Sequence, residues 1–158
     1  ALGDTAAALS EYRQALPLFV KEAEADPINL WKRAAMTEAR TRFAVALAKA
    51  GETAAANEQC AKTVKLMNET PEITDAYILP NWALAFSRLG ETHTLIASNA
   101  KFPKAERRGQ WEKAREMFTR SLQIWQDMQT RGVLDKSAAE EPEKVIREIE
   151  RCDIALKS

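Results

Sequence analysis

The stretch GQWEKAREMFTRSLQIWQDM, residues 109–128, sets a pattern that recurs in the chain. After Gly109, small and large apolar residues follow at intervals of five, nine, twelve, thirteen and sixteen positions. These intervals draw one stripe along a helix of 3.6 residues per turn. The stripe consists of Ala114, Phe118, Ser121, Leu122 and Trp125. We therefore predict an amphipathic helix that is opened by a glycine turn.

The same intervals occur twice upstream. After Gly3, the residues at these intervals are Ala8, Tyr12, Ala15, Leu16 and Phe19. After Gly51, the residues at the same intervals are Ala56, Cys60, Thr63, Val64 and Met67. Recurrence of one helical stripe predicts an array of repeated helices that bury their stripes against neighbours.

The composition favours a single all-α domain over residues 1–158. Glycine and proline are few, at five and six residues, and no long alternation of Val, Ile and Thr supports a sheet. No apolar run approaches 18 residues and no signal peptide is present, so we expect no membrane contact. Two cysteines without a disulfide framework or metal spacing, Cys60 and Cys152, predict buried free thiols and a cytoplasmic location.

The charge balance argues against nucleic-acid binding. Basic and acidic residues number 23 each, which leaves a formal net charge of zero. The nearest approach to a basic patch is Lys101, Lys104, Arg107 and Arg108, expected in a connection. We interpret these as solvated loop charges, with a phosphate or acidic-peptide site as the alternative.

Proline, glycine and the apolar period predict six helices. Their expected ranges are 4–25, 28–50, 51–67, a fourth helix around Trp82 to Leu89, 110–130 and 142–157. Pro17 should kink the first helix, and Pro80 should either kink the fourth or delay its start to Asn81. Leu89-Gly90 resembles the other glycine turns, so residues 99–108 are interpreted as an insertion. The one-sided stripe of residues 142–157 is typical of a capping helix.

The first striped helix lacks a partner on its N-terminal side, because residues 2–5 lead directly into it. We therefore expect the chain to be part of a longer protein, in which another helix covers that face.

The helix pairs resemble tetratricopeptide repeats through the pattern A-x3-F-x2-A. It is matched by Ala8/Tyr12/Ala15, Ala56/Cys60/Thr63 and Ala114/Phe118/Ser121. The signature W-x2-L-G-x2-Y is met in part by Leu79, Trp82, Ala83 and Phe86, and by Arg40, Phe43, Ala44 and Leu47. The glycines are spaced more widely than the family's repeat of about 34 residues. The resemblance implies antiparallel helix pairs stacked as an α-α superhelix, with about six helices and a C-terminal capping helix.

Three further segments resemble the C-terminal repeat tails of bacterial serine/threonine protein kinases of the acidobacterial type. These are LGDTAAAL at residues 2–9, RSLQIWQD at 120–127 followed by Arg131-Gly132, and ERCDIAL at 150–156. The kinase motifs G-x-G-x-x-G, H-R-D and D-F-G are not in the sequence. The resemblance therefore implies a regulatory or partner-binding region that does not itself transfer phosphate.

No residue pattern predicts catalysis, a cofactor or a metal site. His93 has no carboxylate spaced to share a metal, so we expect it to be packed or half-exposed. Trp31, Trp82, Trp111 and Trp125 are expected to pack in the core rather than to form a ligand cage. The pairs Glu22/Glu24 and Glu140/Glu141 show no arrangement that would raise a carboxyl pKa.

The repeat resemblance implies a groove for a protein or peptide partner, without a carboxylate clamp. Its expected lining is Glu38, Thr41, Arg42, Val45 and Lys49 from the second helix and Leu84, Ser87, Arg88 and Glu91 from the fourth. The leading hypothesis is a non-catalytic interaction scaffold that takes an extended or helical segment. Self-association, or docking on another domain of the parent chain, is the alternative, and a helical enzyme is a third.

Overall fold

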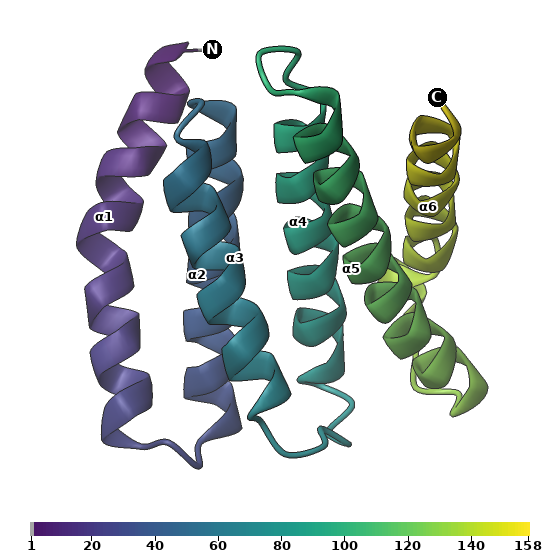
Figure 1. The fold of residues 1–158 in the computed structure, drawn as a ribbon. Helices are drawn as coiled ribbons and strands as arrows, with labels where there is room; N and C mark the ends of the chain where they lie inside the picture. The colour runs from purple at the N-terminus through teal and green to yellow at the C-terminus, as the bar shows by residue number, and fades with distance from the viewer. Residues whose placement is uncertain (1) are drawn as a thin grey trace. The chain divides into compact units, whose positions relative to one another are not determined.

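The computed structural model describes residues 2–158, with the side chains of residues 6–158. Within these residues it contains six α-helices and no strand (Figure 1). The helices are α1 (Leu2–Ala25), α2 (Leu30–Lys49), α3 (Thr53–Asn68), α4 (Leu79–Ala97), α5 (Lys104–Thr130) and α6 (Glu141–Lys157), with a short 3-10 turn at Lys136–Ala138. The all-α prediction is confirmed. The chain divides into two compact units, Ala1–Glu72 and Ile73–Ser158, and each is described by itself.

The first unit contains α1, α2 and α3, in which α2 packs antiparallel against both of its neighbours in sequence. The turn between α1 and α2 is closed by Asn29, whose side chain accepts hydrogen bonds from the backbone N–H of Trp31 and Lys32. An asparagine at this position satisfies donors that the first helical turn leaves unpaired. The second helix therefore begins at Leu30, two residues later than the sequence predicts.

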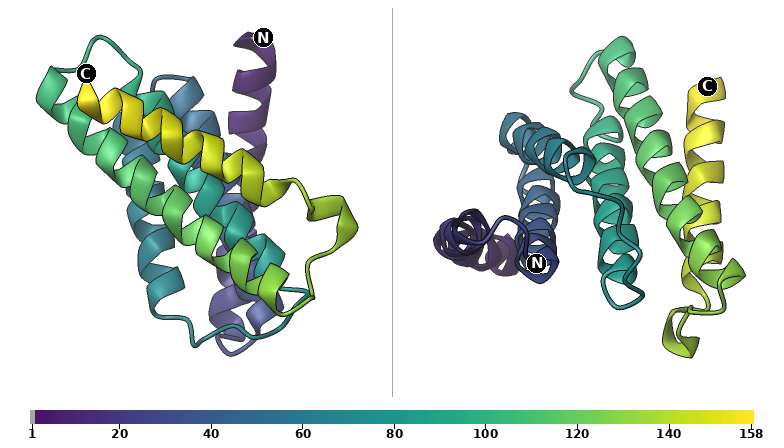
Figure 2. Two further views of the ribbon diagram at one scale, coloured as in Figure 1. Left: turned by 90° about the vertical axis from the view of Figure 1, so that its right-hand side faces the viewer. Right: turned by 90° about the horizontal axis from the view of Figure 1, so that it is seen from below.

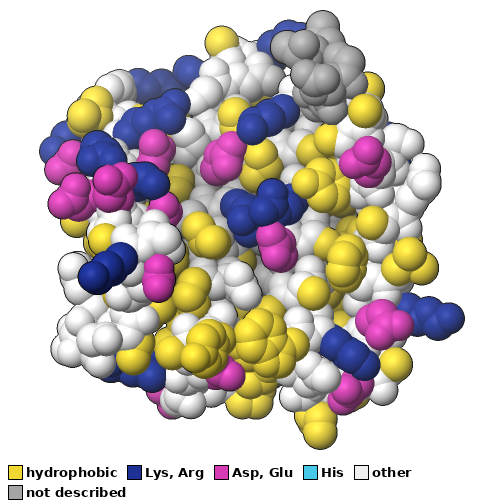
Figure 3. Space-filling view, turned by 180° about the vertical axis from the view of Figure 1, so that it is seen from behind, with side chains coloured by type: hydrophobic (Ala, Val, Ile, Leu, Met, Phe, Trp, Pro, Cys, Tyr) yellow, Lys and Arg dark blue, Asp and Glu magenta, His cyan; other side chains and the backbone are white. Residues whose placement is uncertain are grey.

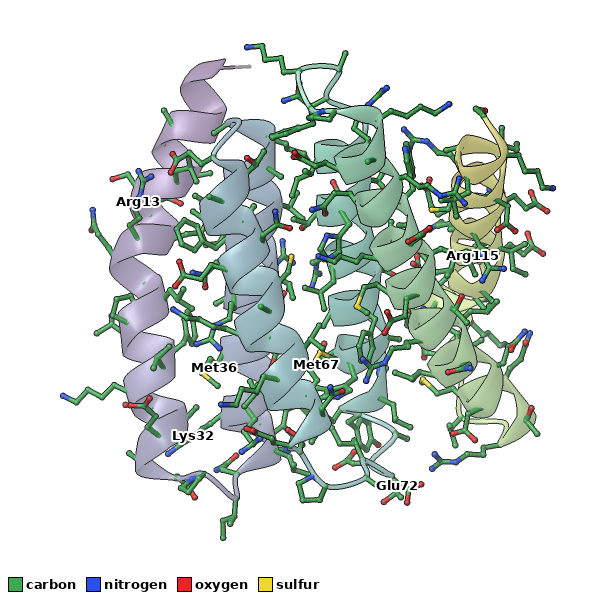
Figure 4. The ribbon with its side chains drawn as sticks, in the orientation of Figure 1. Arg13, Lys32, Met36, Met67, Glu72 and Arg115 are labelled. Atoms are coloured by element: carbon green, nitrogen blue, oxygen red, sulfur yellow. The ribbon has the colours of Figure 1, made fainter. Side chains whose placement is uncertain are left out.

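Gly51 ends α2 as the sequence predicts. It has a φ of +81°, and the N–H of Glu52 donates to the carbonyl of Leu47 at 2.9 Å. This closure needs a left-handed residue after the helix, which glycine adopts without strain. The side chain of Glu52 accepts two hydrogen bonds of 2.9 Å from Arg13, which is labelled in Figure 4, and this contact joins α1 to the start of α3.

The second unit contains α4, α5 and α6. Helix α5 lies between the other two in the right-hand view of Figure 2 and packs against each of them. Pro80 stands in the first turn of α4, where its missing N–H costs no helical hydrogen bond. The late start predicted as one alternative is therefore close to the observed start at Leu79. Gly132 ends α5 with a φ of +67°, and Pro142 lies in the first turn of α6, both as predicted.

Helix α5 begins at Lys104, so most of the stretch 99–108 is a turn and the first part of this helix. The expectation that Lys104, Arg107 and Arg108 lie in a connection is wrong. Lys104 Nζ donates to the carbonyl of Ser158 at 2.8 Å, and Arg108 donates to that of Leu156 at 3.0 Å. These cations stabilise the C-terminal end of α6, where carbonyl groups lack helical partners.

Two of the three repeated stripes are buried as predicted. Along α3 and α5 their small positions Ala56, Thr63, Ala114 and Ser121 are fully enclosed. The stripe of α1 is only half-buried, and Phe19 is 40% exposed, because within its unit α1 packs mainly on α2.

The glycine-turn prediction holds at Gly51 but is wrong at Gly3, Gly90 and Gly109, which lie within α1, α4 and α5. Trp82 and Trp125 are core residues, as expected, but Trp111 is only half-buried and Trp31 is 55% exposed. Trp31 lies in the first turn of α2, beside the exposed loop that leads from α1.

Candidate binding groove

A cavity of about 590 Å³ opens along one flank of α5, with α4 and α6 as its walls. We call it the α4–α6 groove. It is lined by Leu84, Ser87, Arg88, Glu91, Thr94, Leu95 and Ser98 of α4, Phe118 of α5, and Glu141, Lys144, Val145, Glu148 and Arg151 of α6. Cavities of this size are in the range that proteins use to bind ligands and partner side chains.

The α4 wall contains all four residues that the sequence predicts for the fourth helix. Leu84, Ser87, Arg88 and Glu91 are spaced by three or four residues and therefore share one face of α4. The same face continues to Ser98, over a length of about 21 Å at 1.5 Å per residue. The predicted α4 residues are thus brought together in one groove.

The floor of the groove is the ring of Phe118, which lies directly against the backbone of α4. A Cβ atom placed on Gly90 would be 2.7 Å from two atoms of this ring. Only glycine allows this approach, so Gly90 has a packing role in the middle of α4. Below the floor, Ser121 donates to the carbonyl of Ala83 at 2.8 Å and lies 2.8 Å from the hydroxyl of Ser87.

The α6 wall surrounds one apolar residue with charges of both signs. Val145 is 3% exposed, whereas Lys144 pairs with Glu141 at 2.7 Å and Arg151 with Glu148 at 3.5 Å. The hydrogen bond that Lys144 donates to Glu141 raises the pKa of Lys144. Figure 3 shows basic and acidic side chains interspersed on the side where α6 lies. This wall therefore has no dominant charge.

The hydroxyl of Thr94 is buried at the groove without a partner. Thr94 is 4% exposed, and its Oγ1 has no hydrogen-bond partner among the side chains that the structure describes. The neighbouring groove hydroxyls are paired, since Ser98 donates to the carbonyl of Thr94 and Ser87 meets Ser121. A buried hydroxyl without a partner costs about 1–3 kcal/mol, which a ligand group could recover.

The five residues expected from the second helix lie in the first unit, outside this groove. Glu38 and Arg42 form an ion pair of 2.8 Å, and Lys49 is exposed. Thr41 and Val45 are buried, and the hydroxyl of Thr41 donates to the carbonyl of Glu38. Thr41 and Val45 therefore contribute to the core of the unit rather than to its surface.

His93 is packed inside the second unit, which agrees with one of the two environments expected for it. It is 6% exposed, and its Nδ1 lies 2.7 Å from Oε1 of Gln110. Burial lowers the pKa of His93 and the nearby charge of Lys113 adds to this, while the bond to Gln110 opposes it. The neutral imidazole is therefore the stable form in this environment.

The two cysteines are buried free thiols, as predicted. Burial, with the charge of Glu148 adding to it, raises the pKa of Cys152 to about 11, which makes its thiolate scarce at neutral pH. Among residues 6–158, no group of three or more His, Cys, Asp and Glu side chains is arranged to hold a metal ion.

The α6 wall is not among the residues expected to line a groove, because the sequence predicts residues 142–157 only as a capping helix. The available signal was the spacing of Glu141, Lys144, Val145, Glu148 and Arg151, which places charged residues beside an apolar one on a single helical face. The sequence predicts Phe118 as a buried residue of the apolar stripe. Its place in the groove depends on how α5 crosses α4.

Comparison of the chain with protein-family models, with curated proteins and with solved structures found no match in any of the three. Within residues 2–158, no helix combines the length and the apolar character that crossing a membrane requires.

Proposed function

We propose that this chain is a non-catalytic protein-interaction module, and that its α4–α6 groove binds an amphipathic helix of a partner protein. The observation that carries the proposal is the groove itself, which is lined by one face of α4, one face of α6 and the buried Phe118 of α5. The resemblance to tetratricopeptide repeats and to the C-terminal tails of bacterial serine/threonine kinases supports the same class of function.

A helix suits the groove better than an extended chain. Helical grooves receive helices through apolar anchors spaced by three, four and seven residues. The α4 face offers Leu84 and Leu95, which are three turns apart and half-buried, while Val145 of α6 is a buried part of the lining. Charged residues of both signs line the rim, so the partner helix would carry both signs beside its apolar stripe.

Selection of helical peptides tests the proposal directly, because the selection itself finds the sequences that bind. A library of displayed amphipathic peptides is selected on the wild-type protein, and the enriched peptides are measured against two variants. Leu84→Asp places a charge on the groove wall. Ile154→Asp makes the same kind of change on α6 at a residue that is 67% exposed and outside the groove.

We expect the enriched peptides to bind wild type and Ile154→Asp equally and Leu84→Asp at least about tenfold more weakly, since a desolvated apolar anchor contributes about 1.4 kcal/mol or more. Circular dichroism checks that both variants are folded. Enrichment of no peptide, or equal binding to the Leu84→Asp variant, would contradict the proposal.

A second candidate function, association with another copy of the chain, is supported by an apolar surface on the first unit. Leu18 is 65% exposed, Phe19 40%, Ile28 88% and Trp31 55%, and all four lie between the last two turns of α1 and the first turn of α2. Large exposed apolar side chains that cluster in this way are typical of an interface. Sedimentation velocity over a range of protein concentrations tests this second function. Ile28→Lys is expected to weaken the dimer. A wild-type protein that is monomeric at every concentration would count against self-association.

A further inference from the structure

The first unit contains a second cavity, of about 380 Å³, between the C-terminal half of α1, the start of α2 and the end of α3. Four basic side chains line it, Arg33, Arg40, Lys62 and Lys65, against two acidic ones, Glu24 and Glu69. We call this cavity the Arg40 pocket. It lies in a different unit from the α4–α6 groove, so an inference about it does not depend on the proposed function.

Arg40 lies in this pocket with part of its guanidinium group unsatisfied. Its Nε is buried and has no hydrogen-bond partner in the part of the chain that the structure describes. Its Nη2 lies 3.9 Å from the thioether sulfur of Met36, and sulfur is a weak acceptor. Burial lowers the pKa of Arg40, and the charge of Glu24 only partly opposes this. A buried guanidinium N–H without an acceptor is costly to keep.

Arg33 adds a second positive charge, and the acceptors that hold it are neutral. Its guanidinium donates to Thr70 Oγ1 at 2.7 Å and 3.1 Å, to the carbonyl of Leu66 at 3.3 Å and to that of Pro27 at 3.1 Å. These bonds hold the side chain rigidly between α2 and α3 while its charge remains available to the pocket.

The two lysines are engaged with exposed carboxylates. Lys62 pairs with Glu58 on the surface of α3, and Lys65 lies 3.9 Å from Glu69, with the side chains of this second pair more than 60% exposed. Ion pairs of this kind contribute little and exchange readily. An anion in the pocket would therefore meet two guanidinium groups and two ammonium groups.

The rest of the lining is apolar. Val20, Ala23 and Pro27 face it from α1 and the following turn, Met36 from α2 and Leu66 from α3. Figure 4 shows Met36 directed from α2 toward the space beside α1. A ligand that fits this lining carries an anionic group and an apolar body.

We propose that the Arg40 pocket binds a small organic oxyanion, a carboxylate or phosphate group on an apolar body, with Arg40 as its principal contact. Arginine presents planar donors that match both kinds of oxyanion. The volume of the pocket is within the range of small-molecule sites.

Titration of the ¹⁵N-labelled protein with three probes tests the proposal. Phenyl phosphate and benzoate supply the two anionic groups on the same ring, and benzyl alcohol supplies the ring without a charge. We expect saturable shifts of the Arg33 and Arg40 side-chain signals with at least one of the anions, weakened by added sodium chloride, and at least tenfold weaker binding of benzyl alcohol. The ratio of the two anion affinities shows whether phosphate or carboxylate is preferred.

Two neutralising variants on α2 localise the site. Arg40→Gln should weaken anion binding at least about tenfold, whereas Arg42→Gln should leave it unchanged, because Arg42 pairs with Glu38 outside the pocket. Arg40→Lys keeps the charge without the planar donors, so it should bind more weakly than wild type and more tightly than Arg40→Gln. Its loss relative to wild type is the test if Arg40→Gln does not fold. Absence of saturable binding by both anions, equal binding of benzyl alcohol, or equal loss in the position-40 and position-42 variants would overturn the proposal.

Discussion

The contact between Gly90 and Phe118 makes a specific prediction about stability. Replacement of a helical glycine by alanine normally stabilises a protein by about 0.8–1 kcal/mol. At Gly90 the new methyl group would lie 2.7–2.8 Å from three atoms of the Phe118 ring. Carbon atoms prefer about 3.5–4.0 Å, so the ring or the helix must move by about 0.8 Å or more.

Such overpacking costs about 1–3 kcal/mol. Subtracting the gain in helix propensity, we expect Gly90→Ala to lower the free energy of unfolding by about 1 kcal/mol. Gly109→Ala is a matched control in the same unit, because it lies inside α5 and its Cβ would meet nothing within 4 Å. This control should raise the free energy of unfolding by about 0.8–1 kcal/mol, so the two variants should differ by about 2 kcal/mol.

Urea unfolding followed by tryptophan fluorescence measures both changes, with Trp82 and Trp125 reporting from the core of this unit. A double variant identifies the cause. In a Phe118→Leu background the added methyl group no longer meets the ring, so Gly90→Ala should lose most of its cost. If Gly90→Ala stabilises wild type as much as Gly109→Ala does, the close approach of Phe118 to α4 is not as the structure has it.

Three further predictions concern the core of the second unit. Because burial lowers the pKa of His93, the folded protein binds fewer protons at this residue than the unfolded chain does. The free energy of unfolding should therefore fall as the pH drops below about 6.5. His93→Gln should remove this dependence in urea titrations between pH 5 and 7. Ser121→Ala removes the hydrogen bond to the carbonyl of Ala83 and should cost about 1 kcal/mol, with Thr119→Ala, on the outer side of α5, costing less than half of that. Cys152 can be followed alone in a variant that lacks Cys60. Its reaction with iodoacetamide at pH 8 should be more than about 100-fold slower in the folded protein than in urea. Equal rates would show that the thiol of Cys152 is accessible in the folded protein.

The helices themselves could be predicted from local signals. Gly51 and Gly132 end α2 and α5 because each supplies a left-handed residue, and Pro142 suits the first turn of α6. The stripes of α3 and α5 identified their buried faces, since small residues at helical spacing allow close approach of a neighbouring helix. These signals act within a few residues, so they do not depend on how the helices later pack.

The expectation that a glycine marks a turn is wrong at Gly90, where glycine allows close packing inside a helix. Gly90 resembles the helix-ending glycines in its local sequence, yet it lies inside α4 because Phe118, 28 positions later, occupies the place of a side chain. The sequence predicts Lys104 and Arg108 as solvated loop charges, because the carbonyl groups that accept their hydrogen bonds, at Ser158 and Leu156, are about 50 residues away in the sequence. Neither partner could be inferred from neighbouring residues.

The sequence by itself determined that the chain is all-helical, the approximate positions of its six helices, and the faces by which α3 and α5 are buried, because hydrophobic period and helix-ending residues act locally. Only the tertiary structure decided that Leu84, Arg88 and Glu91 share a groove with α6, and that Arg40 lines a pocket with three other basic side chains. Both features depend on contacts between helices that are distant in sequence, and one helical period is compatible with many such contacts.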